Sequence, residues 1–290
     1  MSFPYLDETK ELNDITRKTA GGSFIALTDG MTHYELGGPS NGKPVVLVHG
    51  FSTPYFIFDI TFEFLVKSGF RVLRYDLLGR GFSDRPRVKY DINLFVNQLK
   101  GLIDALELEQ VSLLGLSMGG PITASFISEY PDYVSKHILI DPSGVQRTEL
   151  GWLEAVKLPI VGELALGLLG SDKMLKEIAS DLFDPNLVEH FQNQFKIQMQ
   201  YKGFKRAILS TLRGNMLTSF YKIYEHVGKL QKPTLLFWGE KDTTTPFENS
   251  QILLNAMPHA EFHPLANCGH IPHYEKAGIV NPILLEFLSK

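Results

Sequence analysis

Short apolar runs that alternate with segments of helical spacing constrain the fold of this chain more than any other feature. The run PVVLVHG spans residues 44–50, and similar runs recur at residues 70–76, 111–117 and 137–141. Continuous apolar runs of this length are typical of strands buried on both faces of a sheet. The intervals have apolar residues at helical spacing, over residues 55–68, 92–106 and 118–130. Such alternation implies parallel strands joined by right-handed crossovers, and therefore an α/β domain.

The alternation lapses after residue 142 and resumes with PTLLFWG at residues 233–239. The sequence between them is mostly helical and amphipathic, and it is too long for an ordinary loop. We therefore expect an α/β core domain made of residues 1–142 and 231–290, with a helical cap, or lid, at residues 143–230. Upstream, residues 24–38 predict a β-hairpin with Asp29-Gly30 as its turn.

Composition and charge exclude several classes of protein. Hydrophobic residues make up 44% of the 290 residues and charged residues 21%, which is enough to bury a core. A net charge of −4, without a Lys/Arg-rich block, disfavours a nucleic-acid partner. Cys268 is the only cysteine, so no intramolecular disulfide forms. With no signal-like N-terminus and no apolar stretch long enough for stable membrane insertion, we expect a cytoplasmic protein.

Ser117 lies in Gly115-Leu116-Ser117-Met118-Gly119, which fits the pattern G-x-S-x-G. An apolar strand is predicted before this motif and a helix after it. A sharp turn in that context exposes a nucleophilic serine above the strand, and the flanking glycines let the backbone approach closely. The motif therefore predicts that Ser117 is a catalytic nucleophile.

GLSMGG at residues 115–120, HGF at residues 49–51 and DLLGRGFSDRP at residues 76–86 resemble the α/β-hydrolase superfamily. The resemblance is to its serine esterase and lipase-like members with a helical cap, and it is weakest across the cap itself. It implies a mostly parallel central sheet flanked by helices, with the cap inserted after the sixth strand. It also implies that the backbone N–H groups of Phe51 and Met118 form an oxyanion hole, while His49 shapes the loop before Phe51.

The general base should follow the nucleophile and the acid in the chain. His270 lies in a short loop after the last predicted strand, whereas its rival His273 falls where Pro272 opens a helix. For the acid, Asp242 follows the strand at residues 233–239, at the edge where such sheets gather their site residues. The Asp242 carboxylate would accept the Nδ1 proton of His270 and orient its ring.

Two further carboxyl groups compete with Asp242 for the acid role, Glu240 and Asp141. Asp76 and the two arginines Arg80 and Arg85 are assigned structural roles instead. We expect Asp76 to support its loop by hydrogen bonding, and the arginines to be solvated or paired with nearby carboxylates. No cysteine or histidine spacing predicts a metal site, and we expect no cofactor.

The predicted function is hydrolysis of carboxylic esters with an apolar acyl group, through an acyl-enzyme intermediate. The expected partner is a small-molecule or lipid-like ester, contacted by Phe51, Tyr55, Met118 and Trp152. Same-fold alternatives are a C–C bond hydrolase acting on ring-cleavage products and a cofactor-free perhydrolase. Epoxide hydrolases and haloalkane dehalogenases are disfavoured because they have an aspartate where this chain has Ser117. A non-enzymatic alternative is a ligand-binding protein that uses the same pocket.

Overall fold

The computed structural model describes residues 5–146, 151–168 and 170–290, without the side chains of residues 151–153. Its centre is an eight-stranded sheet with the order β1-β2-β4-β3-β5-β6-β7-β8. The strands are β1 (Ser23–Leu27), β2 (Gly30–Gly37), β3 (Pro44–Val48), β4 (Arg71–Tyr75), β5 (Val111–Leu116), β6 (Val134–Ile140), β7 (Thr234–Gly239) and β8 (Glu261–Leu265). From β4 to β8 all neighbours are parallel, whereas β2 runs antiparallel to both β1 and β4.

The apolar runs form the central strands, which confirms the predicted α/β architecture. Every residue of β5 and β7 is buried, as expected for strands covered on both faces. The predicted hairpin is formed by β1 and β2, but its turn lies one residue earlier than expected. Leu27 pairs with Gly30 across the ladder, so the two-residue loop is Thr28-Asp29 and Gly30 opens β2.

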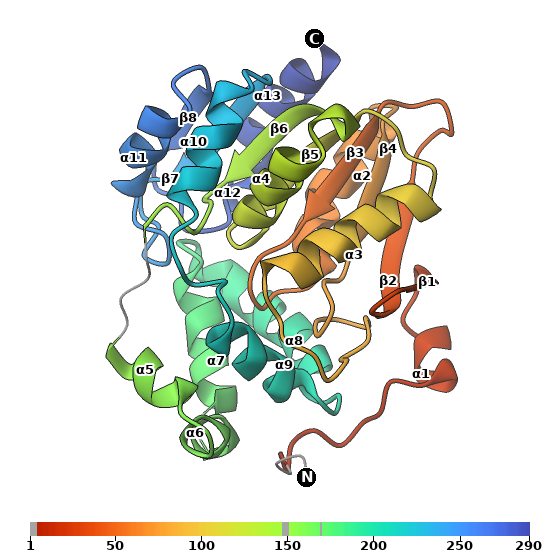
Figure 1. Cartoon of the computed structure of the whole chain (residues 1–290), viewed down its shortest axis with the longest axis vertical. Helices are drawn as coiled ribbons and strands as arrows, with labels where there is room; N and C mark the ends of the chain where they lie inside the picture. Colours follow the sequence, from red (N-terminus) through yellow and green to blue (C-terminus); the bar gives the residue numbers. More distant parts are fainter. Residues whose placement is uncertain (1–4, 147–150, 169) are drawn as a thin grey trace.

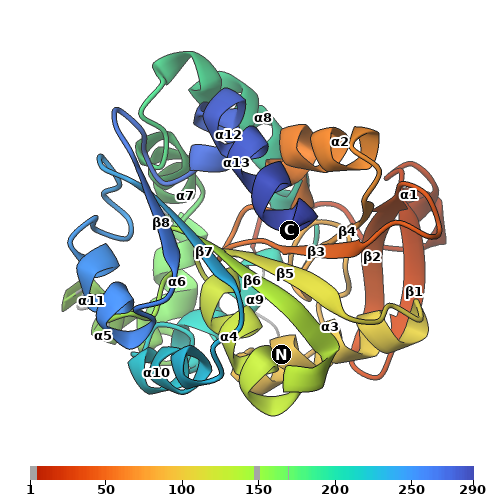
Figure 2. The ribbon, with the colours of Figure 1, turned by 90° about the horizontal axis from the view of Figure 1, so that it is seen from above.

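Helices cover both faces of the sheet (Figure 2). One face is covered by α3 (Ile92–Ala105), α4 (Gly119–Glu129) and α10 (Tyr221–Lys229), with α11 (Asn249–Ala256) packed beside α10. The other is covered by α2 (Asp59–Lys67), α12 (Pro272–Glu275) and α13 (Ala277–Ser289). Single turns of 3₁₀-helix, η1 (Tyr55–Phe58) and η2 (Pro131–Tyr133), precede α2 and β6. Each face thereby gains its own cluster of buried apolar side chains.

The segment between β6 and α10 is helical, and it gathers at one end of the sheet (Figure 1). Its helices are α5 (Gly151–Lys157), α6 (Val161–Leu168), α7 (Gly170–Ser180), η3 (Pro185–Leu187), α8 (Val188–Met199) and α9 (Phe204–Arg213). In contrast, α10 packs against α4 and α11 of the sheet layers. We refer to α5–α9 as the cap helices. Among the residues with described positions, none forms a helix long and apolar enough to cross a bilayer.

The N-terminal segment lies against α8 and α9, a contact that the sequence did not predict. Residues 5–11 precede α1 (Asp14–Lys18) and include Glu8, whose carboxylate accepts from the N–H groups of Gly203 and Lys205, both at 2.6 Å. The Lys205 ammonium, itself buried, binds the Asp7 carboxylate at 2.8 Å. Glu8 thus satisfies free N–H groups at the start of α9, as an N-terminal cap does.

Candidate active site

Ser117 occupies a sharp turn between β5 and α4. Its φ of 52° lies in the left-handed region, which is rare for a residue with a side chain and is typical of strained functional turns. The backbone around it is tightly packed. A Cβ added to Gly119 would lie 2.1 Å from the Val48 oxygen, and one added to Gly115 would lie 2.5 Å from the Gly119 oxygen. The two glycines of the motif are therefore required by close backbone approach.

The loop after β3 runs directly beside Ser117. A Cβ added to Gly50 would lie 3.1 Å from the Ser117 Cβ. The next residue is Phe51, and neither its N–H nor that of Met118 donates a hydrogen bond to any described part of the chain. Two unpaired N–H donors beside a turn serine are the arrangement that an oxyanion hole requires.

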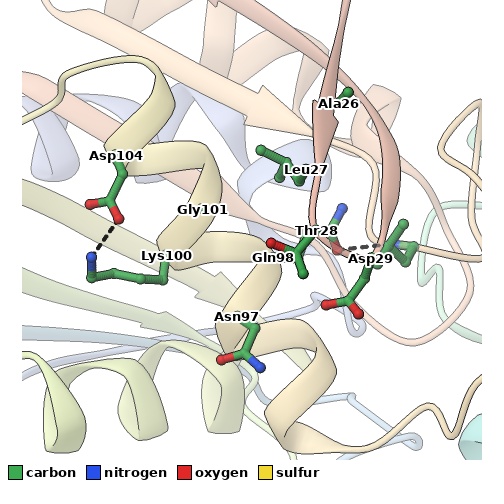
Figure 3. A pocket seen from close by; sticks show the side chains of 10 residues that line it. Ala26, Leu27, Thr28, Asp29, Asn97, Gln98, Lys100, Gly101 and Asp104 are labelled. Carbon is green, nitrogen blue, oxygen red and sulfur yellow. Dashed lines mark hydrogen bonds and ion pairs between the residues drawn. The ribbon is translucent and has the colours of Figure 1, made fainter.

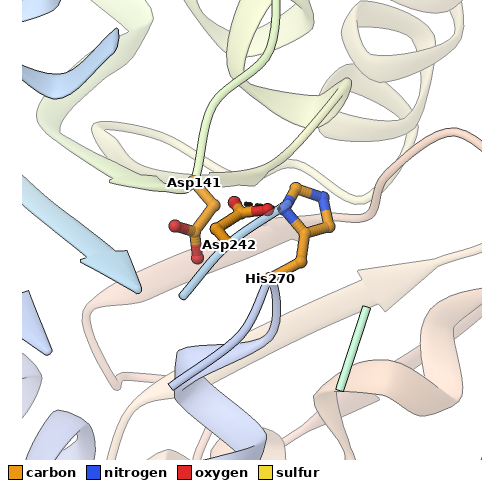
Figure 4. Close-up of side chains that lie close together, drawn as sticks. All are labelled: Asp141, Asp242 and His270. Carbon is orange, nitrogen blue, oxygen red and sulfur yellow. Dashed lines mark hydrogen bonds and ion pairs between the residues drawn. The ribbon is translucent and has the colours of Figure 1, made fainter. Parts of the chain in front are cut away.

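His270 and Asp242 come together at the carboxyl ends of β7 and β8 (Figure 4). The His270 Nδ1 lies 2.7 Å from the Asp242 Oδ2. The other Asp242 oxygen, Oδ1, accepts from the N–H groups of Thr244 and Thr245 at 2.7 and 2.9 Å, and the Thr245 hydroxyl donates to Oδ2 at 2.6 Å. These donors fix the carboxylate, which in turn orients the imidazole and leaves its Nε2 free for proton transfer.

The charges around His270 favour its protonated form. Burial alone would lower its pKa, but the Asp242 carboxylate and the more distant Asp181 and Asp141 outweigh it and raise the pKa to about 10. Burial raises the pKa of Asp242, but His270 and the Thr245 hydrogen bonds more than offset that, and the net direction is downward. The pair therefore stabilises the imidazolium that would form when His270 accepts a proton. Ser117 and His270 form no hydrogen bond here, and in unliganded enzymes this contact commonly tightens on binding.

Asp141, the rival acid, lies beside the same pair but is bonded differently. Its Oδ1 accepts from the Gly239 N–H at 2.9 Å, and its Oδ2 is buried without a hydrogen-bond partner. A carboxylate oxygen of Asp141, a carboxylate oxygen of Asp242 and a ring nitrogen of His270 all lie within 4.8 Å of one another (Figure 4). Burial, followed by repulsion from Asp242, raises the pKa of Asp141 well above its usual value. His270 is thus bonded to Asp242, while Asp141 is bonded to the Gly239 N–H.

Three side chains have the supporting roles that were expected of them. His273 is buried at the start of α12, where its Nε2 donates to the Ile57 oxygen at 3.0 Å and burial lowers its pKa to about 3. His49 shapes the Phe51 loop: its Nδ1 donates to the Gly50 oxygen and its Nε2 accepts from the Leu77 N–H, both at 2.9 Å. Asp76 holds its loop by accepting from three donors, the His33 Nδ1 and the N–H groups of Tyr55 and Phe82.

The sequence profile of the α/β hydrolase fold family matches residues 43–277 of the chain. The chain belongs to this family. The matched residues include strands β3 to β8 and the Ser117 turn.

Sequence relatives of this α/β hydrolase include enzymes named as hydrolases of 2-hydroxy-6-oxo compounds. The AB hydrolase superfamily protein YisY of Bacillus subtilis (strain 168) is 26% identical over 251 residues, which cover 85% of this chain and 92% of the relative. A 2-hydroxy-6-oxononadienedioate/2-hydroxy-6-oxononatrienedioate hydrolase of Comamonas testosteroni is 28% identical over 293 residues, covering 96% and 99%.

Solved structures of similar shape include both a meta-cleavage product hydrolase and an esterase. A meta-cleavage product hydrolase from Pseudomonas fluorescens IP01 matches with a TM-score of 0.76 at 25% identity, covering 92% of this chain and 97% of that one. A thermophilic esterase from Thermogutta terrifontis matches with a TM-score of 0.78 at 24% identity, covering 93% and 98%. At 24% identity, the match to the esterase shows similarity of fold alone.

Three of the four side chains predicted to contact substrate belong to the described part of this hydrolase. Phe51 is half-buried beside the Ser117 turn, whereas the Met118 side chain is 2% exposed within the core. The Tyr55 ring stacks on His33 at 4.9 Å and lies under the Arg74 guanidinium at 4.5 Å, so both contacts hold it against β2 and β4. The side chain of Trp152, in α5, lies outside the described residues.

Arg80 corrects the expectation that it is solvated or paired with a carboxylate. It is fully buried, and no described carboxylate lies within ion-pair distance of it. Its Nε donates to the Phe51 oxygen at 2.8 Å and its Nη2 to the Thr211 Oγ1 at 2.9 Å. In the sequence Arg80 lies in a polar, glycine-rich turn, and no local pattern there indicates that the cap covers its side chain.

Cap residues that contact the site loops were also missed. The Asp181 oxygen accepts from the His270 N–H at 2.8 Å, and its carboxylate accepts from the Thr244 hydroxyl at 2.5 Å. The Glu275 carboxylate accepts from the N–H groups of Phe183 and Gly269 at 2.8 and 2.9 Å, joining the cap to the His270 loop. These partners are far apart in the sequence, and no local pattern marks them.

A surface pocket of about 440 Å³ lies elsewhere on the molecule, between the β1–β2 hairpin and α3 (Figure 3). At its edge the Lys100 ammonium is bound to the Asp104 carboxylate at 2.5 Å. None of the predicted site residues lines this pocket.

Proposed function

We propose that this α/β hydrolase cleaves carboxylic esters with an apolar acyl group through an acyl-enzyme on Ser117. The observation that carries the proposal is the left-handed Ser117 turn beside the unpaired N–H groups of Phe51 and Met118. The hydrogen-bonded pair of His270 and Asp242 supplies the base and its orienting acid.

In the proposed reaction the Ser117 Oγ attacks the ester carbonyl carbon while His270 Nε2 takes its proton. The carbonyl oxygen becomes negative, and the Phe51 and Met118 N–H groups stabilise it. The C–O bond to the alcohol then breaks, and the alcohol leaves with the proton held by His270. Water attacks the acyl-enzyme by the same path in reverse, releasing the acid and restoring Ser117.

The charges near His270 favour an uncharged acyl group over an anionic one. The carboxylates of Asp242 and Asp181 both raise its pKa, against the effect of burial. A carboxylate on the substrate would be repelled by them at short range. A neutral ester is therefore favoured over a substrate of the dienoate type.

Stopped-flow hydrolysis of p-nitrophenyl esters from acetate to laurate tests the proposal. We expect a burst of p-nitrophenol followed by steady turnover, because acylation releases the alcohol before water resolves the intermediate. Ser117→Ala should lower the rate by at least about 1000-fold. Ser125→Ala, a buried serine on the following helix α4, is the matched control and should retain the rate.

C–C bond hydrolysis is the second candidate, and the named sequence relatives favour it. Loss of absorbance of 2-hydroxy-6-oxo-6-phenylhexa-2,4-dienoate on mixing with the enzyme would reveal this activity. Turnover of the dienoate without turnover of any ester, with both lost in Ser117→Ala, would replace the ester assignment by the C–C assignment.

A further inference from the structure

Two peptide carbonyls of the loop that follows β3 are held by side chains from outside the loop. The Phe51 oxygen accepts from Arg80 Nε at 2.8 Å, and the Ser52 oxygen accepts from Gln198 Nε2 at 2.7 Å. Phe51 also provides one of the N–H groups proposed for the oxyanion hole. That N–H lies in the peptide group just before the two whose oxygens Arg80 and Gln198 hold, so these contacts restrain the backbone on its C-terminal side.

Gln198 reaches this loop from the cap, because it lies on α8. Its side chain is almost fully buried, and both ends of the amide are used: Oε1 accepts from the Gly81 N–H at 2.9 Å. Only one amide orientation satisfies both contacts. A buried amide satisfied at both ends is rigid, and loss of either bond leaves a buried polar group without a partner.

Arg80 is also fixed by the cap, through Thr211 on α9. The guanidinium lies over the rings of Phe51, Tyr90 and Phe95, 5.4–5.9 Å from their centroids. Burial lowers its pKa to about 9, so it remains a cation at neutral pH. A buried cation without an ion-pair partner is costly, and here it lies beside the loop where negative charge would develop in the reaction.

We propose that Gln198, together with the Arg80–Thr211 pair, positions the oxyanion loop, so that the cap completes the oxyanion hole. This inference rests on the proposed function. Gln198 and Thr211 are positioning residues, since they act on the reacting atoms through the Phe51 and Ser52 peptide groups. It follows that α8 and α9 stay in contact with the core during turnover, because their departure would release the loop.

The test uses an alkyl fluorophosphonate, which reports on the oxyanion hole without a known substrate. Ser117 Oγ attacks phosphorus, the P–O bond forms as the P–F bond breaks, fluoride leaves and His270 takes the serine proton. The phosphoryl oxygen gains charge in the transition state. We expect Gln198→Leu to slow phosphonylation by about 10- to 100-fold, below the loss for removing an oxyanion donor outright. The kcat for p-nitrophenyl butyrate should fall in parallel, with KM changed less than about threefold.

Gln192→Leu is the matched control. Gln192 lies on the same helix, but its Nε2 donates to the Leu175 oxygen, within the cap. Its loss should leave the phosphonylation rate within about twofold of wild type. The Thr211 pair is tested by Thr211→Val, which removes the hydroxyl and should slow the reaction, and by Thr211→Ser, which keeps the hydroxyl and should restore the rate.

The outcomes separate this inference from the proposed function. Wild-type phosphonylation rates in both Gln198→Leu and Thr211→Val would overturn the positioning role and leave the ester proposal standing. A raised KM with unchanged kcat would also overturn it, since that pattern indicates substrate contact. If Gln198→Leu does not fold, the Thr211→Val and Thr211→Ser comparison decides alone. Failure of wild-type Ser117 to react at all would refute the proposed function, and the inference with it.

Discussion

Single charged groups around His270 determine how the enzyme should respond to pH. In the proposed reaction His270 must be neutral to accept the Ser117 proton, and its pKa is raised above 6.5, chiefly by Asp242 against the effect of burial. We therefore expect kcat/KM to rise with pH through a midpoint above 6.5. The sign for stability is opposite: a raised histidine pKa stabilises the fold fully below about 6.5, and that contribution is lost as the pH rises through about 10.

Asp242→Asn tests this account of the pH profile. The amide removes the charge that favours the imidazolium, so the midpoint should move to lower pH, and kcat should fall by about 1000- to 10,000-fold because the tautomer is no longer fixed. Asp181→Asn is the control, since Asp181 acts on His270 through charge and its side chain is bonded to Thr244. It should give a smaller shift and keep most of the activity. An unchanged midpoint in Asp242→Asn would contradict the assignment.

Asp141 should destabilise the protein as the pH rises. Its folded pKa is well above 3.8, so the folded state holds a proton that the unfolded state has lost, and the free energy of unfolding falls with pH above about 4. Asp141→Asn keeps the oxygen that accepts from Gly239 and removes the ionisation. Urea denaturation at pH 5 and pH 8 should show a smaller pH-dependent loss in the variant than in wild type. An equal loss in both proteins would show that Asp141 does not carry this effect.

At the scale of elements, the Ser117 turn depends on close contact between β3, β5 and α4. Gly119→Ala would place a methyl carbon 2.1 Å from the Val48 oxygen. We expect the free energy of unfolding to fall by about 1–3 kcal/mol, as in other overpacked interiors, and the turn to shift. Gly278→Ala is the control, because a Cβ there meets no atom within 4 Å and lies in helix α13. It should raise stability by about 0.5–1 kcal/mol. Equal urea midpoints for the two variants would disprove the packing argument.

Elements with a strong local pattern could be predicted from the sequence, and long-range contacts could not. The runs at residues 44–50 and 111–117 became β3 and β5 because continuous burial on both faces needs continuous apolar sequence. The pairing of His270 with Asp242 could be anticipated from the ends of β7 and β8. By contrast, the environments of Arg80 and Gln198 depend on how the cap docks, and no periodicity encodes that contact.

At the scale of the whole molecule, the N-terminal segment is bound to the start of α9 in the cap, although the two are far apart in the sequence. Glu8→Ala removes the acceptor for the Gly203 and Lys205 N–H groups and should lower the free energy of unfolding by about 1–2 kcal/mol. Glu11→Ala, which breaks only an exposed pair with Lys202, should have a much smaller effect. Denaturant titration of both variants provides the measurement, and equal losses would refute the capping role.

The proposed acyl-enzyme forms on Ser117, where residues far apart in the chain gather at one end of the sheet. Intact-mass spectrometry of enzyme mixed with p-nitrophenyl butyrate and acid-quenched during the burst would detect this intermediate. We expect a mass gain of one butyryl group, located by peptide mapping to Ser117 and absent in Ser117→Ala. Ester turnover without any adduct on Ser117, or with an adduct on another residue, would contradict it.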